Sequence, residues 1–381
     1  MHFTSVRLEN WRNFLRADVA LQRRAFIVGP NASGKSNFLD AFRFLRDVAD
    51  AQGGFQRAVH ARRGVSQIRS LHARRYPNVV IDVEIDLDAG HPWNYRLEFT
   101  QDNQRRPMIG RERVRHGSKV VIDRPDDDDK SDPSRLTQTY LEQVNANRGF
   151  REINEFLAQV RYLHLVPQLV REPDRSLGRI RDPYGGDFLE QLARTPKGTL
   201  ESRLRRIREA LRVAVPQLKE LKLDRDIRGV PHLKGLYEHW RPNAGWQTED
   251  QFSDGTLRLL GLLWVFLDGA APLLLEEPEL SLHTAVIRHI PRMIARLGRK
   301  TGRQVLLSTH SADLLSDEGI APEEVLLLEP SEEGTEVRVA QEDEQVRDLL
   351  KAGATIAETV LPRTAPKRVT QLSLFGDRNG G

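Results

Sequence analysis

The residues with the clearest chemical purpose form a glycine-rich loop near the N-terminus, Gly29-Pro30-Asn31-Ala32-Ser33-Gly34-Lys35-Ser36. The loop follows an apolar run at 24–28 and opens a helix-periodic segment at 35–48, which is the context that the G-x-x-x-x-G-K-S pattern requires. Backbone N–H groups of such a loop point at a phosphate, and the dipole of the following helix adds to their attraction. We expect Lys35 to bridge the β- and γ-phosphates of a nucleotide and Ser36 to offer its hydroxyl to Mg²⁺.

Two carboxylates end a second apolar run, Leu273-Leu274-Leu275-Glu276-Glu277. Glu276 would hold Mg²⁺ through water, and Glu277 would orient and deprotonate the attacking water. Paired carboxylates also end strands by accident. The glycine-rich loop upstream is what makes the functional interpretation the stronger one.

Three further segments complete a set. Phe252-Ser253-Asp254-Gly255-Thr256 precedes the carboxylates, residues 278–283 follow them, and residues 306–311 end a later apolar run. In this order they resemble the signature loop, the D-loop and the switch-histidine strand of the ABC-type ATPases of the SMC, RecF and OLD branch, often described as AAA-family ATPases. The resemblance covers residues 1–45 and about 160–330.

The resemblance implies ATP and Mg²⁺ as cofactors and an active site shared by two subunits. It implies that the loop and two residues of the early Asn-Trp-Arg-Asn-Phe turn bind the nucleotide. These residues are Gly29, Asn31, Ala32, Ser33, Gly34, Lys35, Ser36 and Asn37 of the loop and its helix, and Arg12 and Asn13 of the turn. It gives the catalytic roles to Lys35, Glu277 and His310, with His310 sensing the γ-phosphate. The expected metal set is Ser36, Glu276 and Gln168.

In the same resemblance, ATP held by one subunit is contacted by the opposite subunit's signature residues Ser253, Asp254 and Gly255. The chain is therefore expected to form a homodimer around ATP. Simpler explanations stand beside these roles. Ser253 is also a plausible helix N-cap, His310 can cap a strand end, and Gln168 can be a surface side chain after Pro167.

Two departures favour the OLD and RecF side of this branch over transporters. Glu276 replaces the usual Asp, and His283 stands where transporter subunits usually carry Asp. OLD nucleases carry a Toprim domain after the head, whereas only a short remainder follows the last head strands here. A nuclease or other effector is therefore expected on a separate polypeptide.

Composition excludes several classes of protein. The 381 residues include no cysteine, which rules out a disulfide scaffold and thiol chemistry. No apolar run reaches the roughly 18–20 residues of a membrane-spanning helix, and the N-terminus lacks the layout of a signal peptide. We expect a cytoplasmic protein without a membrane partner. A net charge of +4 with interspersed signs permits DNA contact without demanding it.

The pattern of elements predicts an α/β fold with a parallel sheet covered by helices, and the resemblance implies a P-loop NTPase head of the ABC type. Its expected parts are lobe I with the glycine-rich loop and an antiparallel β layer (1–125), an acidic loop and largely helical insertion (126–250), lobe II (251–345), and a C-terminal helix and tail (346–381). Helical patterns at about 134–158 and 199–221 are too short for a coiled-coil arm. The acidic run 126–130 reads as a solvated loop rather than a metal site, and the Arg-rich segment 203–212 as a face toward water rather than a phosphate site.

These observations favour an ATP-hydrolysing switch that acts on DNA or on a partner effector nuclease, in DNA repair or phage defence. One alternative is the ATPase subunit of an ABC transporter. Another is a scaffold that binds ATP and scarcely hydrolyses it, which the intact Lys35, Glu277 and His310 disfavour.

The polar tail contains one apolar cluster, Gln371-Leu372-Ser373-Leu374-Phe375. It resembles the peptide by which bacterial replication and repair proteins bind the sliding clamp, and an apolar cluster in a polar tail is costly to leave exposed. Docking onto the protein's own surface is the competing explanation.

If the tail binds the clamp, replacing Leu374 and Phe375 together by Ala removes both apolar anchors and abolishes retention of the purified protein on immobilised clamp. Retention that survives this double substitution would rule out the clamp peptide.

Overall fold

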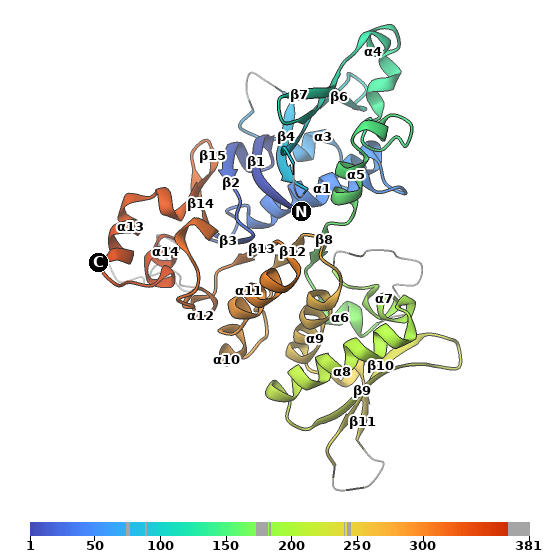
Figure 1. Cartoon of the computed structure of the whole chain (residues 1–381), viewed down its shortest axis with the longest axis vertical. Coiled ribbons are helices and arrows are strands. Elements are labelled where there is room, and N and C mark those ends of the chain that lie inside the picture. The colour runs from blue at the N-terminus through green and yellow to red at the C-terminus, as the bar shows by residue number, and fades with distance from the viewer. Residues whose placement is uncertain are drawn as a thin grey trace, which may run out of the picture.

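The computed structural model describes residues 1–73, 77–87, 90–172, 182, 184–239, 241 and 245–364. Figure 1 shows an antiparallel sheet at one end of the molecule, a mostly parallel sheet in the middle, and a unit of helices and short strands at the other end. Among the described residues, no helix has both the length and the apolar character needed to cross a bilayer.

The central sheet has the strand order β15-β14-β3-β13-β12-β8. Its strands are β3 (Arg24–Val28), β8 (Arg161–Leu163), β12 (Leu273–Glu276), β13 (Val305–Thr309), β14 (Val325–Ser331) and β15 (Gly334–Val339). All neighbours run parallel except β14 and β15. The core strands are continuous apolar runs because helices cover both faces of a parallel sheet. The carboxyl ends of β3, β12 and β13 consequently share one edge.

Helices α1 (Lys35–Ala49), α9 (Asp254–Leu267), α10 (Thr284–Ile287), α11 (Ile290–Thr301), α12 (Ala312–Leu315), α13 (Glu344–Lys351) and α14 (Ile356–Thr364) accompany this sheet. The segment after β12 forms two helices, α10 and α11, separated by Arg288 and His289. Pro291 lies in the first turn of α11, where a missing N–H costs nothing.

The expected antiparallel layer is present as a six-stranded sheet, β2-β1-β4-β5-β6-β7. Its strands are β1 (His2–Trp11), β2 (Phe14–Ala20), β4 (Val79–Asp86), β5 (Trp93–Gln101), β6 (Pro107–His116) and β7 (Lys119–Arg124). Side chains alternate between buried and partly exposed along β4 and β5, and the buried ones join the core that α1 fills with Phe38, Phe42 and Phe44. The short helices α2 (Phe55–His60) and α3 (Val65–Ile68) follow α1.

The insertion is only partly helical. It contains α4 (Asp127–Ser131), α5 (Arg151–Ala158), α6 (Pro167–Val170), α7 (Phe188–Arg194) and α8 (Lys197–Ala214), together with an antiparallel sheet of β9 (Leu218–Arg225), β10 (Pro231–Tyr237) and β11 (Trp246–Thr248). Of the helix expected over 134–158, only α5 is α-helical. The second helix stops at Ala214 rather than continuing to 221, since Pro216 disfavours helical backbone before it and the chain turns into β9.

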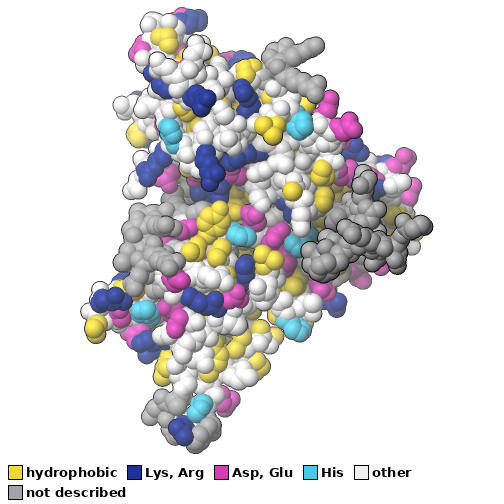
Figure 2. All heavy atoms as spheres, turned by 180° about the vertical axis from the view of Figure 1, so that it is seen from behind, with side chains coloured by type: hydrophobic (Ala, Val, Ile, Leu, Met, Phe, Trp, Pro, Cys, Tyr) yellow, Lys and Arg dark blue, Asp and Glu magenta, His cyan; other side chains and the backbone are white. Residues whose placement is uncertain are grey.

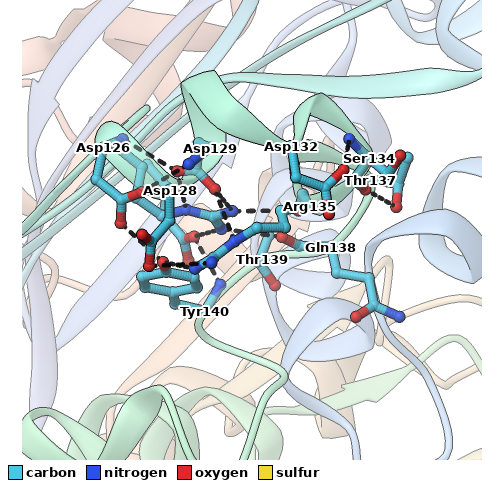
Figure 3. Close-up of polar contacts among 12 residues, drawn as sticks. Asp126, Asp128, Asp129, Asp132, Ser134, Arg135, Thr137, Gln138, Thr139 and Tyr140 are labelled. Carbon is cyan, nitrogen blue, oxygen red and sulfur yellow. Dashed lines mark hydrogen bonds and ion pairs between the residues drawn. The ribbon is translucent and has the colours of Figure 1, made fainter.

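The expectation of a solvated acidic loop is only partly correct, because the run forms the short helix α4, in which Asp127, Asp128 and Lys130 are exposed but Asp129 is buried. Asp126 caps the N-terminus of α4 by accepting the backbone N–H of Asp129 at 2.9 Å, and Asp129 itself is 1% exposed. The Arg124 guanidinium donates to both Asp129 carboxylate oxygens, at 2.8 and 2.9 Å. The sequence pattern missed this because the partner arginine belongs to β7, outside the acidic run. Figure 3 shows the polar contacts of this segment, with Asp126, Asp129 and Tyr140 among the labelled residues.

Arg124 is the centre of a larger buried cluster. Its guanidinium also donates to Glu112 at 3.1 Å and to the backbone carbonyl oxygens of Arg135 and Gln138, and it lies 3.7 Å from the centre of the Tyr140 ring. Glu112 is fully buried and accepts the backbone N–H groups of Tyr140 and Leu141. The cluster thus fastens the segment after β7 onto the antiparallel sheet.

Elsewhere the charges are mixed. Figure 2 shows basic and acidic side chains scattered among apolar ones over one face of the molecule. On the Arg-rich helix, Arg205, Arg206 and Arg212 are exposed, as expected. Arg203 instead pairs with Asp268 at 3.0 Å and lies over the Trp264 ring.

Replacing Arg124 by Met should lower the free energy of unfolding by about 3–5 kcal/mol, because Glu112 would stay buried without a cation and Asp129 would keep only the contact to Arg135 at 3.4 Å. Urea denaturation followed by tryptophan fluorescence measures the loss. Arg111 provides the matched control, since it pairs with Asp123 on neighbouring strands with both side chains more than a third exposed, and Arg111→Met should cost less than about 1 kcal/mol. Equal losses in the two variants would show that burial is not what makes the cluster important.

Candidate functional site

The glycine-rich loop joins the end of β3 to the start of α1 and closes tightly on itself. Gly34 has a φ of 96°, a left-handed conformation that favours glycine. A Cβ atom at Gly29 would lie 2.5 Å from the Ser33 hydroxyl oxygen and 2.7 Å from the Leu328 carbonyl oxygen on β14. Only a glycine fits there without displacing the neighbouring strand. The loop is therefore preformed, with its backbone exposed at the carboxyl edge of the sheet.

Lys35 is buried at the base of this loop, with 6% of its surface exposed. Its ammonium group donates to the carbonyl oxygens of Gly29 and Pro30 at 2.9 and 3.1 Å. Burial lowers the pKa of Lys35, and the nearby carboxylates, Glu277 foremost, act in the opposite direction. A cation whose hydrogen-bond partners are all neutral is well placed to bind an anion.

Glu276 ends β12 and receives two hydroxyl donors. Ser36 donates to its Oε1, and the Tyr162 phenol donates to its Oε2. The Nδ1 atom of His164 lies 3.3 Å from the Glu276 carbonyl oxygen. Burial, with the Glu276 charge beside it, raises the pKa of Tyr162 well above its usual value, so the phenol remains a donor at neutral pH.

Glu277 and His310 meet at the same edge. Glu277 has a φ of 43°, unusual for a residue with a side chain, and its backbone N–H donates to the Ser308 carbonyl oxygen on β13 at 3.1 Å. The Nδ1 atom of His310 lies 3.2 Å from the Glu277 Oε1 atom. The two expected catalytic side chains are thus in contact although 33 positions separate them in the chain.

Glu279 lies behind this pair and is 5% exposed. It accepts the Thr309 hydroxyl at 2.5 Å, and burial raises its pKa. Its other oxygen, and the hydroxyls of Ser33 and Ser308, are buried without a hydrogen-bond partner within the described chain. Such buried polar atoms are costly unless something bonds to them.

The donor set fits a nucleotide with a magnesium ion. The loop N–H groups, the Ser33 hydroxyl and Lys35 are anion donors, while the Ser36 hydroxyl and the Glu276 carboxylate are the oxygen ligands that Mg²⁺ prefers. In the ranges that the structure describes, no three His, Asp or Glu side chains form a metal cage. Mg²⁺ commonly binds through one or two protein groups plus phosphate oxygens.

Arg12 and Asn13 line a cavity of about 430 Å³ beside the loop, together with Ala32 and Asn37. Asn37 donates to the side-chain oxygen of Asn13, whose amide donates to the Ala32 carbonyl oxygen at 3.4 Å. Arg12 donates to the Gln67 carbonyl oxygen at 3.1 Å. The structure therefore brings both early residues to the flank of the loop.

The signature segment opens α9. Ser253 caps this helix, its hydroxyl accepting the Thr256 N–H at 3.2 Å, as the simpler explanation of this residue predicted. A Cβ atom at Gly255 would lie 2.6 Å from the Ser281 carbonyl oxygen of the 278–283 turn. No hydrogen bond or ion pair between described residues joins 253–255 to the chain's own loop at 29–36.

Sequence reasoning missed three polar side chains at these segments. Tyr162 and His164 reach Glu276, and Arg171 donates to the Phe252 carbonyl oxygen at 2.6 Å while pairing with Asp254 at the same distance. The sequence signal for Tyr162 and His164 was the apolar run at 162–166, which is typical of a strand. That this strand pairs with β12 is seen only in the fold. Gln168 is exposed on α6, without a described hydrogen bond to Ser36 or Glu276, so its metal role stays a prediction. Residues 371–375 lie outside the described residues.

Comparison with solved structures places the fold. The Smc head bound to the C-winged helix domain of ScpA matches over 89% of this chain and 98% of its own, with a TM-score of 0.57 and 12% identity. The Smc head with an extended coiled coil, bound to the C-terminal domain of ScpA derived from Pyrococcus furiosus, matches over 92% and 99%, with a TM-score of 0.52 and 11% identity. At such identities the likeness concerns the fold alone. The predicted ABC-type head fold with its antiparallel layer is confirmed.

A curated relative, Endonuclease GajA of Bacillus cereus (strain VD045), is 34% identical over 67 residues. That match covers 18% of this chain and only 12% of the endonuclease. The family described as "AAA domain, putative AbiEii toxin, Type IV TA system" matches residues 24–317, a range that contains the glycine-rich loop, the carboxylate pair and His310. The chain therefore belongs to this family of AAA-type ATPases.

Proposed function

We propose that this chain is an ATP-hydrolysing head that dimerises around ATP and acts as a switch on DNA or on a partner effector. One observation carries the proposal. The loop, Glu277 and His310 meet at a single sheet edge, whereas no described hydrogen bond or ion pair joins the signature residues 253–255 to the loop of the same chain. A second copy of the chain would supply the missing side of the site.

Within one subunit, each polar group has a task that its position supports. Lys35 and the loop N–H groups bind the phosphates, and the Arg12–Asn13 cavity accepts the nucleoside. Ser36 and Glu276 would hold Mg²⁺, which when bound supplies charge neutralisation at the phosphates. Glu277 takes the proton from the attacking water. His310, 3.2 Å from Glu277, orients that carboxylate and reaches toward the γ-phosphate.

The signature segment of the opposite subunit would close the site. Ser253 caps the N-terminus of α9, where backbone N–H groups and the helix dipole favour an anion. Arg171 holds the segment in place through Phe252 and Asp254. Binding of ATP would thus join two heads, and hydrolysis would release them.

The biological setting is a proposal by likeness. The partial match to an endonuclease supports a role beside a nuclease encoded as a separate chain, in phage defence or DNA repair. The solved Smc heads are bound to domains of ScpA, which supports a protein partner for this head as well.

Replacing Glu277 by Gln should preserve ATP binding and remove the proton acceptor, so turnover falls at least about 10²-fold and an ATP-bound dimer accumulates. Phosphate release and light scattering after size-exclusion chromatography measure the two effects. Adding Lys35→Ala to the same variant is the control, since it removes phosphate binding and should restore the monomer. A Glu277→Gln protein that stays monomeric with ATP contradicts the sandwich.

Sharing of the site can be tested by mixing two inactive proteins. Ser253→Arg and Lys35→Ala damage opposite halves of each site, so a mixed dimer retains one intact site and some turnover returns. Mixing Ser253→Arg with Gly255→Arg should restore nothing, since both damage the same half. Turnover absent from both mixtures, or equal in both, would count against a site built from two subunits.

ATP turnover should rise when duplex DNA is added if DNA is what the switch acts on. Phosphate release is compared with and without DNA, using the Glu277→Gln variant as the blank. Turnover that is independent of DNA would contradict a switch that acts on DNA and leave a protein effector as its target.

A further inference from the structure

We propose that Tyr162 is a positioning residue for the divalent metal ion, because its phenol holds Glu276 in the orientation that the metal requires. This inference rests on the proposed function and adds to it a residue that lies outside all of the expected motifs. Its role would be to fix one carboxylate oxygen so that the other faces Ser36.

The contacts divide the two oxygens of Glu276 between two hydroxyls from different parts of the fold. Oε1 accepts from Ser36 in the first turn of α1, and Oε2 accepts from Tyr162 on β8. Ser36 is the group expected at the metal, so Oε1 is the oxygen on the metal side. Oε2 is turned away from it and is held by the phenol.

The phenol is itself held firmly. Tyr162 pairs in parallel register with Leu274, two residues before Glu276, so its ring lies against the end of β12. The Arg43 guanidinium lies 5.0 Å from the centre of the ring and pairs with Asp40 at 2.7 Å. Asp40 is buried and bonds to Arg62 as well. A chain of packed groups therefore connects Tyr162 to the interior of lobe I.

The identity of residue 276 explains why such a donor is needed. Glu carries one more rotatable bond than Asp, and each free rotor must be ordered before a metal can bind. A hydrogen bond from outside the metal's own ligands is the common means of orienting a ligating carboxylate. Tyr162 supplies that bond. It lies a few residues before Gln168, the residue that was expected at the metal.

The test measures metal affinity rather than turnover. In the Glu277→Gln background, so that ATP is not consumed, the rise in melting temperature caused by ATP is followed as free Mg²⁺ increases. Tyr162→Phe removes only the hydroxyl and should raise the Mg²⁺ concentration at half-effect about tenfold. ATP binding in EDTA should not change.

Tyr95→Phe is the matched control. Its phenol also donates to a buried glutamate, Glu112, at 3.1 Å, but in the antiparallel sheet. It should cost stability and leave the Mg²⁺ dependence as it was. In a Glu276→Asp background, where the shorter side chain cannot reach both hydroxyls, Tyr162→Phe should add little.

A Mg²⁺ half-effect within twofold of the parent, or an equal loss of ATP binding in EDTA, would overturn the positioning role while the proposed ATPase stands. A parent protein that ATP does not stabilise at any Mg²⁺ concentration would instead overturn the proposed function, and this inference with it.

Discussion

The site depends on the parallel pairing of β3, β13 and β12. Parallel neighbours place their carboxyl ends at one edge of the sheet, and the register is specific, with Leu306 opposite both Ala25 and Leu274. Groups that are hundreds of residues apart in the chain therefore meet there. Apolar packing sets this register, since a slip by one position would move every side chain of the strand to the opposite face of the sheet, where its packing partners differ.

The polar groups at that edge are held by one another. Ser36 and Tyr162 converge on Glu276, His310 contacts Glu277, and Thr309 bonds to Glu279. Within the described part of the chain, the Ser33 and Ser308 hydroxyls and one Glu279 oxygen are nevertheless buried without a hydrogen-bond partner. A ligand could supply the hydrogen-bond partners that these polar atoms lack in a single subunit. This agrees with the proposed switch driven by phosphate binding.

The antiparallel sheet has a different role, because it anchors the start of the long insertion. Arg124 is almost completely buried between Glu112 and Asp129, and it donates to the backbone carbonyl oxygens of Arg135 and Gln138 in the segment after β7. A buried ion pair is costly to desolvate and contributes little net stability. The buried ion pair instead fixes the path of the chain after β7. Its directional hydrogen bonds specify that path more strictly than an apolar contact would.

The sequence alone determined the motif residues and the fold class. Local spacing carries that information, because the glycine-rich loop, the strand before it and the helix after it are contiguous, and so are Glu276 and Glu277. What only the tertiary structure decided were the contacts between distant segments. Tyr162 on Glu276, Arg124 on Asp129 and the three-stranded sheet of the insertion all depend on which strands become neighbours, and long-range pairing leaves no local signature. Ser253 shows both sides, since its capping role was readable from its position, whereas the contact that it would make in the proposed dimer depends on assembly.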